Sequence, residues 1–146
     1  MTETGRILAL DYGTRKVGVA LTDALQITAA PYLTIRYESR TDLMRQIQDI
    51  IEDREIVEIV VGVPIGLSGE DTKFTTHVRE FITELKAAVT QPVHNVDERF
   101  TSADAKASLI QMGIKTGHNK EKVDAMAAAH LLRYYLDLRE AKGTDS

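Results

Sequence analysis

Three acidic residues, Asp11, Glu98 and Asp124, stand at positions where a strand or a helix does not by itself require a carboxylate. Asp11 ends one apolar run, Glu98 follows another, and Asp124 opens a helical pattern rich in alanine. Three carboxylates that converge repel one another unless a cation lies between them, and oxygen ligands favour hard ions. The residue types therefore predict a site for Mg²⁺ or Mn²⁺. Two such ions can activate a water molecule and stabilise the leaving oxygen of a phosphodiester.

The surroundings of Asp11 make it the most informative of these acids. An apolar run over residues 7–10 leads into it, the chain turns at Gly13, and the apolar pattern resumes over residues 17–21. This pattern is typical of a β-hairpin whose first strand is buried. A carboxylate on such a strand is unfavourable unless it is paired or holds a cation, so Asp11 needs a partner.

Strand geometry separates the neighbouring acids Asp97 and Glu98. Side chains alternate along a strand, so the two cannot both face one metal ion. We assign Glu98 to the site and Asp97 to backbone or loop hydrogen bonds; Arg99 either steadies a scissile phosphate or pairs with an acid. Simpler interpretations also exist. Asp97 can cap the turn into the next helix, and Asp124 can complement the positive end of a helix dipole.

The apolar patterns also predict the elements that must position these acids. The expected strands cover roughly residues 6–11, 16–22, 31–37, 56–61 and 93–97. Helices are expected to begin at Thr41–Asp42, Thr72, Thr101–Ser102 and about Glu121. Tight turns favour an antiparallel meander first, and the later helices favour parallel strands added by right-handed crossovers. The prediction is an α/β fold with a five-stranded mixed sheet, three antiparallel strands plus two parallel, flanked by helices. Asp11 and Glu98 then share the functional edge at the carboxyl ends of the strands.

Composition limits the class of protein. The chain of 146 residues suits one domain over residues 1–140, followed by a flexible tail over 141–146. It has no cysteine, which excludes disulfides, zinc thiolate sites and thiol nucleophiles. No apolar run approaches the roughly 20 residues that cross a bilayer, and the first residues do not resemble a signal peptide. We expect a cytoplasmic protein without membrane association. The net charge of −4 does not favour bulk attraction to nucleic acid, although a nuclease can combine acids at its metal site with a basic rim.

A glycine-rich loop follows the fourth expected strand, between Gly62 and Gly69. The simplest interpretation is a connection that needs permissive backbone angles. It is not a phosphate-binding P-loop, because no Gly-Lys-Ser/Thr follows. A second interpretation is that the loop overhangs the acids and that Gly66 and Gly69 contact the substrate backbone.

The histidines and the paired tyrosines give weaker signals. The four histidines are widely spaced and show no metal-ligand pairing, so we expect them at the surface or in packing contacts. Tyr134 and Tyr135 lie at helical spacing behind Leu131. This favours a packing role over a platform on which bases stack.

Four segments of the chain form a recognisable set: residues 9–20, 60–69 and 97–102, and Val123-Asp124 followed by Ala127-Ala128. Together they resemble the YqgF (RuvX) family, the group of Holliday-junction resolvases or pre-16S rRNA nucleases with an RNase H-like fold. They run in the family's order and span nearly the whole chain. Classical resolvases carry a further acid near the end of the fourth strand. This chain has Val61-Gly62-Val63-Pro64 there, which fits YqgF rather than those relatives.

The resemblance implies that Asp11, Glu98 and Asp124 are the catalytic, metal-binding acids. It also implies that further residues surround the site, where we assign them to substrate binding: Lys16, Arg99, Thr101 and Ser102. The activity implied is a metal-dependent endonuclease acting on structured nucleic acid. The family's role is divided between precursor rRNA, at the 5′ end of pre-16S rRNA, and branched DNA, so the resemblance names a chemistry better than a substrate.

Other functions remain open from the sequence. One is a non-catalytic ribosome-assembly or nucleic-acid-binding protein with the same fold. Another follows from residues 10–14, which also resemble the first phosphate loop of actin-like ATPases and sugar kinases; those proteins need two such subdomains and this chain supplies one. The oligomeric state is open as well. A two-fold junction calls for a homodimer, whereas RNA trimming can be done by a monomer.

Overall fold

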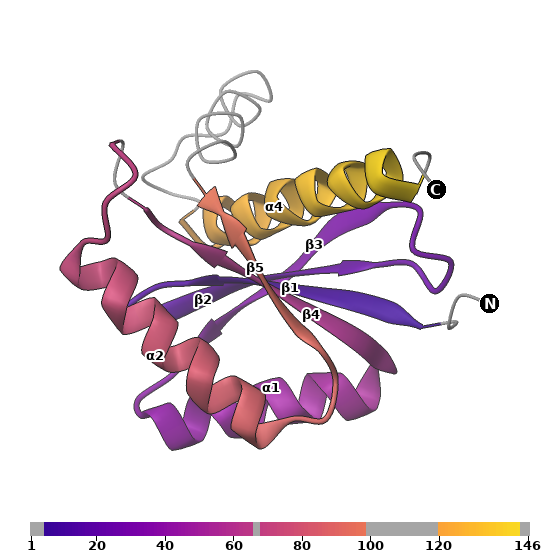
Figure 1. The fold of residues 1–146 in the computed structure, drawn as a ribbon. Helices are drawn as coiled ribbons and strands as arrows, with labels where there is room; N and C mark the ends of the chain where they lie inside the picture. Colours follow the sequence, from indigo (N-terminus) through magenta and orange to yellow (C-terminus); the bar gives the residue numbers. More distant parts are fainter. Residues whose placement is uncertain (1–4, 66–67, 99–119, 144–146) are drawn as a thin grey trace.

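The computed structural model describes residues 5–65, 68–98 and 120–143, and within the last range it describes the side chains of 123–141 (Figure 1). The strands are β1 (Arg6–Tyr12), β2 (Lys16–Thr22), β3 (Ala29–Arg36), β4 (Ile56–Val63) and β5 (Val93–Asp97). The helices are α1 (Arg40–Asp53), α2 (Lys73–Ala88) and α4 (Lys120–Gly143). The helix expected to begin at Thr101–Ser102 lies outside the described residues.

All five strands form one sheet in the order β3-β2-β1-β4-β5. β1 pairs with β2, and β2 with β3, in antiparallel fashion, whereas β1 with β4 and β4 with β5 run parallel. The predicted five-stranded mixed sheet is therefore confirmed. β3 and β5 form the two opposite edges of the sheet (Figure 1).

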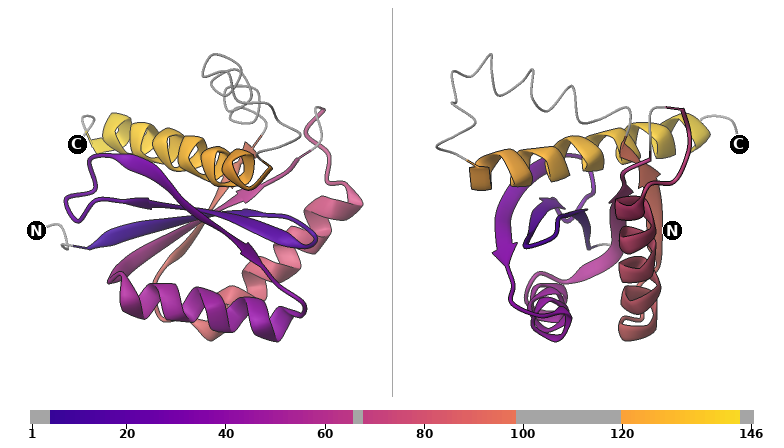
Figure 2. Two further views of the ribbon diagram at one scale, coloured as in Figure 1. Left: turned by 180° about the vertical axis from the view of Figure 1, so that it is seen from behind. Right: turned by 90° about the vertical axis from the view of Figure 1, so that its left-hand side faces the viewer.

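Helices cover both faces of the sheet. α1 and α2 pack on one face and α4 on the other, as the two views of Figure 2 show. Alternation along β1 assigns its side chains to these layers. Leu8 and Leu10 belong to the core beneath α1 and α2, whereas Ile7 and Ala9 belong to the core beneath α4. Asp11 is the next residue in the second series, so it lies at the carboxyl end of β1 on the α4 face.

The helix ends differ in part from the expected ones. α1 begins at Arg40 because Ser39 caps it, its side chain accepting a hydrogen bond from the amide of Asp42. The expected cap at Thr41–Asp42 is thus wrong, since Asp42 lies in the first turn. The expected start at Thr72 is confirmed, because Thr72 forms a reciprocal capping box with Thr75.

β4 and α4 end later in the chain than the sequence pattern predicted. β4 continues to Val63, so Gly62 lies inside a strand and not in the loop that follows. α4 continues to Gly143, three residues into the segment expected to be a flexible tail. Within the described ranges, no helix combines the length and apolar character needed to cross a bilayer.

Candidate active site

The structure brings Asp11 and Glu98 together on the α4 face of the sheet. Asp11 lies near the end of β1, and Glu98 follows the last residue of β5, so only β4 separates their strands. The two side chains share a hydrogen bond, which requires that one of the two carboxyl groups carries a proton. Glu98, and not Asp97, is therefore the acid that reaches Asp11.

Burial and proximity change the ionisation of this pair. Burial raises the pKa of Asp11, an effect that the hydrogen bond from Glu98 partly offsets. The pKa of Glu98 is raised far above its ordinary range, first by burial, then by the hydrogen bond to Asp11 and its charge, and last by the charge of Asp97. Two carboxylates in one site cannot both ionise unless a proton or a cation compensates them. The pair therefore holds a proton in the metal-free protein.

Gly62 creates the space in which Glu98 meets Asp11. This residue lies on β4, between the two strands that carry the acids, and its register partner on β5 is Val96. A Cβ atom on Gly62 would lie 2.7 Å from both Cγ and Cδ of Glu98, a separation that real Cβ atoms do not show. A glycine inside a strand is typical of such a close approach.

Gly18 plays a similar part for Asp124 at the start of α4. In the sheet, Gly18 is the register partner of Asp11. A Cβ atom on Gly18 would overlap the backbone carbonyl of Asp124 and lie 3.1 Å from the amide nitrogen of Ala125. The missing side chain lets α4 approach β2 closely, and this contact places the Asp124 backbone beside the strand that pairs with Asp11.

The three predicted acids do not all meet in the structure. Among the described residues, no three acidic or histidine side chains form a group that could hold a metal ion. Asp11 and Glu98 form a pair, and Asp124 is positioned by its backbone. The donor set of the pair nevertheless suits a hard cation, because it consists of carboxylate oxygens whose ionisation needs a compensating charge.

The predicted substrate-binding residues fall into two groups. Lys16 opens β2 and lies two residues before Gly18, on the α4 face and half-exposed. Gly69 has a φ of 86°, which agrees with a connection that needs permissive backbone angles. The other four lie outside the described residues: Gly66, Arg99, Thr101 and Ser102.

Aromatic side chains on the opposite face hold the hairpin that carries Asp11. The Tyr12 hydroxyl lies 3.1 Å from Nε2 of His77, and the Tyr37 hydroxyl donates to the Gly13 carbonyl at 2.7 Å. His77 thus has a packing role, as expected. The sequence patterns alone did not indicate that Gly18 and Gly62 make room for the acids. A glycine inside an otherwise apolar strand was the available signal.

A family model described as RuvX, Holliday junction resolvase, matches residues 5–138. The chain belongs to the RuvX family. A relative from Koribacter versatilis (strain Ellin345), named "Putative pre-16S rRNA nuclease", is 44% identical over 136 residues, covering 92% of this chain and 88% of the relative. A Roseiflexus sp. (strain RS-1) relative of the same name is 35% identical, covering 93% and 96%.

Solved structures show the same architecture as this RuvX-family chain. Thermus thermophilus RuvC in complex with Holliday junction substrate aligns with a TM-score of 0.58, 11% identity, and coverage of 92% of this chain and 96% of that chain. The fowlpox virus resolvase bound to Holliday junction DNA aligns with a TM-score of 0.58 and 11% identity, covering 90% and 97%. The predicted RNase H-like fold is confirmed.

Proposed function

We propose that this protein is a metal-dependent endonuclease that hydrolyses phosphodiesters in structured nucleic acid. Its candidate roles are processing of the 5′ end of pre-16S rRNA and resolution of Holliday junctions. The observation that carries the proposal is the buried contact of Asp11 with Glu98 at the carboxyl ends of their strands. Perturbed acids at this edge of an open sheet are typical of a functional site.

Asp11, Glu98 and Asp124 would hold Mg²⁺ or Mn²⁺. When bound, the ion would supply Lewis acidity toward a phosphoryl oxygen and toward water. The chain's own contribution is to hold the acids at one edge and to release the proton shared by Asp11 and Glu98. Transfer of that proton to bulk water leaves both carboxylates ionised and able to orient a water molecule by hydrogen bonds. The residues assigned to contact the nucleic-acid backbone are Lys16, Gly66, Gly69, Arg99, Thr101 and Ser102.

A second candidate is a non-catalytic ribosome-assembly or nucleic-acid-binding protein with the same fold. The observation that favours it is that no complete group of three metal-binding side chains occurs within the described ranges. This candidate predicts binding to precursor RNA or to a DNA junction without turnover in either Mg²⁺ or Mn²⁺.

A cleavage assay separates the two candidates. The purified protein is incubated with a four-way DNA junction and with a precursor 16S RNA, each with Mg²⁺, with Mn²⁺ or with EDTA. The endonuclease proposal expects Asp11→Asn to abolish cleavage while the variant stays folded, with an unchanged or higher melting temperature because charge repulsion falls. Asp49→Asn is the matched control, since Asp49 is an exposed acid of α1, on the other face of the sheet. Full activity in Asp11→Asn would reject the mechanism.

The two substrates make different demands on assembly. A junction with two-fold symmetry needs two active sites, so cleavage of the junction predicts a homodimer, whereas trimming of RNA is compatible with a monomer. Light scattering of the protein alone and with each substrate measures this. We propose that either role is carried out in the cytoplasm.

A further inference from the structure

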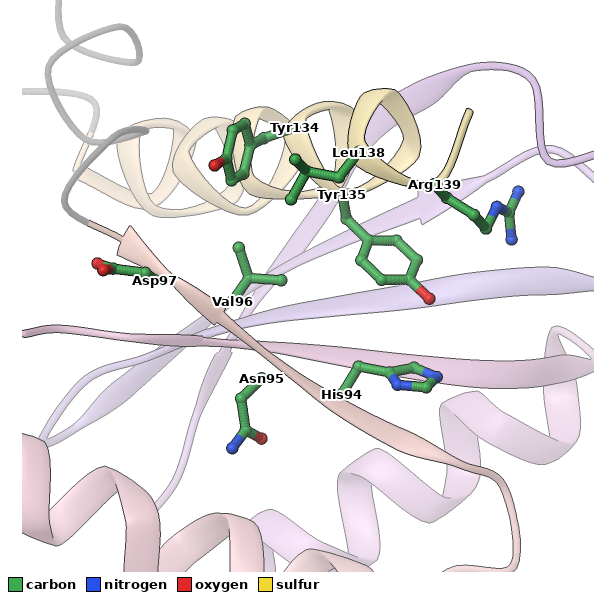
Figure 3. Close-up of a pocket in the computed structure, with 8 residues that line it drawn as sticks. All are labelled: His94, Asn95, Val96, Asp97, Tyr134, Tyr135, Leu138 and Arg139. Atoms are coloured by element: carbon green, nitrogen blue, oxygen red, sulfur yellow. The ribbon is translucent and has the colours of Figure 1, made fainter. Parts of the chain in front are cut away.

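A groove between β5 and the C-terminal half of α4 is not used by the proposed chemistry. It encloses about 480 Å³ (Figure 3). The residues that line it are His94, Asn95, Val96, Asp97, Tyr134, Tyr135, Leu138 and Arg139. Within the described residues β5 is an edge strand, so none of their other strands pairs with its outer side.

One end of the groove is an aromatic and polar cluster organised by Glu58 of β4. The carboxylate of Glu58 accepts a hydrogen bond from the Tyr135 hydroxyl at 2.9 Å. Its oxygens also lie 2.9 Å from Nε2 of His94 and 3.5 Å from Nη1 of Arg139. The rings of His94 and Tyr135 stack with centroids 5.7 Å apart. The guanidinium of Arg139 lies 6.0 Å from the Tyr135 ring centroid. These contacts hold the wall in place before any ligand arrives.

The other end of the groove is an apolar surface next to the edge of the sheet that carries Glu98. Figure 3 shows Tyr134 and Leu138 on α4, facing Val96 on β5. Leu138 is 41% exposed, which is high for leucine, and Tyr134 is half-buried. Asp97 lies at this end and is followed directly by Glu98. At about 3.3 Å per strand residue, Val96 is within roughly 10 Å of Glu98 along the chain.

We propose that this groove binds one unpaired base of a single-stranded segment that adjoins the cleaved phosphodiester. The proposal rests on the proposed function, because it extends the substrate from the catalytic acids along β5. The volume falls in the range of small-molecule sites and suits a single nucleotide rather than a base pair. Tyr134 provides a ring for stacking, which every base can use.

The charges of the groove favour recognition of a base over recognition of phosphate. Arg139 is the cation of the lining, and it lies beside the carboxylate of Glu58, while Asp97 adds a second acid. A nearly neutral site of this kind neutralises few phosphates, so its contribution to binding depends little on salt. Tyr134 packs against the core beneath α4, as expected, and also lines the groove. The proposal adds base stacking, the role that the sequence pattern did not favour.

The test measures binding without cleavage. Full-length protein in EDTA is titrated into RNA and DNA octamers that contain 2-aminopurine, and into a duplex of the same sequence, with anisotropy and base fluorescence as readouts. We expect Tyr134→Ala to weaken octamer binding at least about fivefold and to relieve the quenching of the base. Tyr134→Phe, which keeps the ring, and Leu33→Ala, which removes an exposed leucine of β3, should bind as the wild type does. The salt dependence of octamer binding should be the same for the wild type and the three variants. The tighter-binding octamer shows whether the groove prefers RNA or DNA.

Three results would overturn the proposal that the groove binds a base. The wild type could fail to bind the octamers, Tyr134→Ala could bind them as tightly as the wild type does, or Tyr134→Ala could lose equal affinity for octamer and duplex. If Tyr134→Ala does not fold, Leu138→Ala replaces it, with the same expected loss of octamer binding. The proposal would also be refuted if the β5 edge bound an extended peptide while Tyr134→Ala left the affinity for octamers unchanged. A wild type that binds octamers through Tyr134 but cleaves nothing would instead refute the proposed function and leave the groove standing.

Discussion

The side chain of Glu98 occupies the space above Gly62, where a Cβ atom would lie 2.7 Å from Cγ and Cδ of the glutamate. β4 lies between the strands that carry Asp11 and Glu98, so any side chain at position 62 on this face would stand between the two acids. Their hydrogen bond exists because β4 presents only backbone there.

Replacing Gly62 by alanine should therefore displace Glu98 and separate it from Asp11. We expect Gly62→Ala to lower the free energy of unfolding by about 1–3 kcal/mol, as for overpacking, and to reduce cleavage at least tenfold. A double-mutant cycle with Glu98→Ala in urea checks the cause. Because the contact is with the Glu98 side chain, most of the loss should disappear in the Glu98→Ala background. An equal loss in both backgrounds would contradict this.

Gly18→Ala should be destabilising in a different way. Here the new Cβ meets the Asp124 carbonyl, so α4 must move away from β2. We expect a loss of about 1–3 kcal/mol or more, with lower cleavage because the start of α4 is displaced. Truncating Asp124 to alanine should not restore stability, since the contact is with backbone. Rescue by Asp124→Ala, measured in the same urea cycle, would show that the contact involves the side chain instead.

The metal-free protein should be stabilised by Glu98→Gln. The folded state raises the pKa of Glu98, so it favours the protonated acid, and wild-type stability falls as pH rises above the ordinary range of a carboxyl group. In EDTA at neutral to alkaline pH, we expect the variant to be more stable by about 1 kcal/mol or more, a difference that vanishes near pH 4. Mg²⁺ should raise the melting temperature of the wild type more than that of the variant. Identical melting curves across this pH range would contradict the proposed burial.

Tyr135 should make stability depend on alkaline pH. Burial, followed by the hydrogen bond to Glu58 and its charge, raises the pKa of Tyr135 to about 12. The stabilising contribution of its protonated hydroxyl is complete below about pH 10, the pKa in the unfolded chain, and is lost as pH rises through about 12. Ultraviolet titration of tyrosinate should show one late-ionising group missing in Tyr135→Phe. Tyr134→Phe is the control and should keep that group.

Local sequence patterns predicted most of the strands and some of the helix ends. Apolar runs on either side of the turn at Gly13 identified β1 and β2, and Thr72 identified the start of α2. These features depend on side-chain periodicity and hydrogen bonds between near neighbours, which a single segment encodes. Ser39, as the true cap of α1, was missed because several adjacent residues can cap equally well.

The sequence by itself determined which acids are unusual, that Asp11 and Glu98 come at the ends of strands, and that Asp124 opens a helix. Tertiary structure alone decided that Glu98 crosses β4 at Gly62, that Gly18 admits the backbone of Asp124, and that β5 and α4 form a groove beside the acids. The physical reason is that strand register and helix approach arise from packing between segments distant in the chain. Periodicity reveals the face on which a residue lies, but not which distant atom occupies the space next to it.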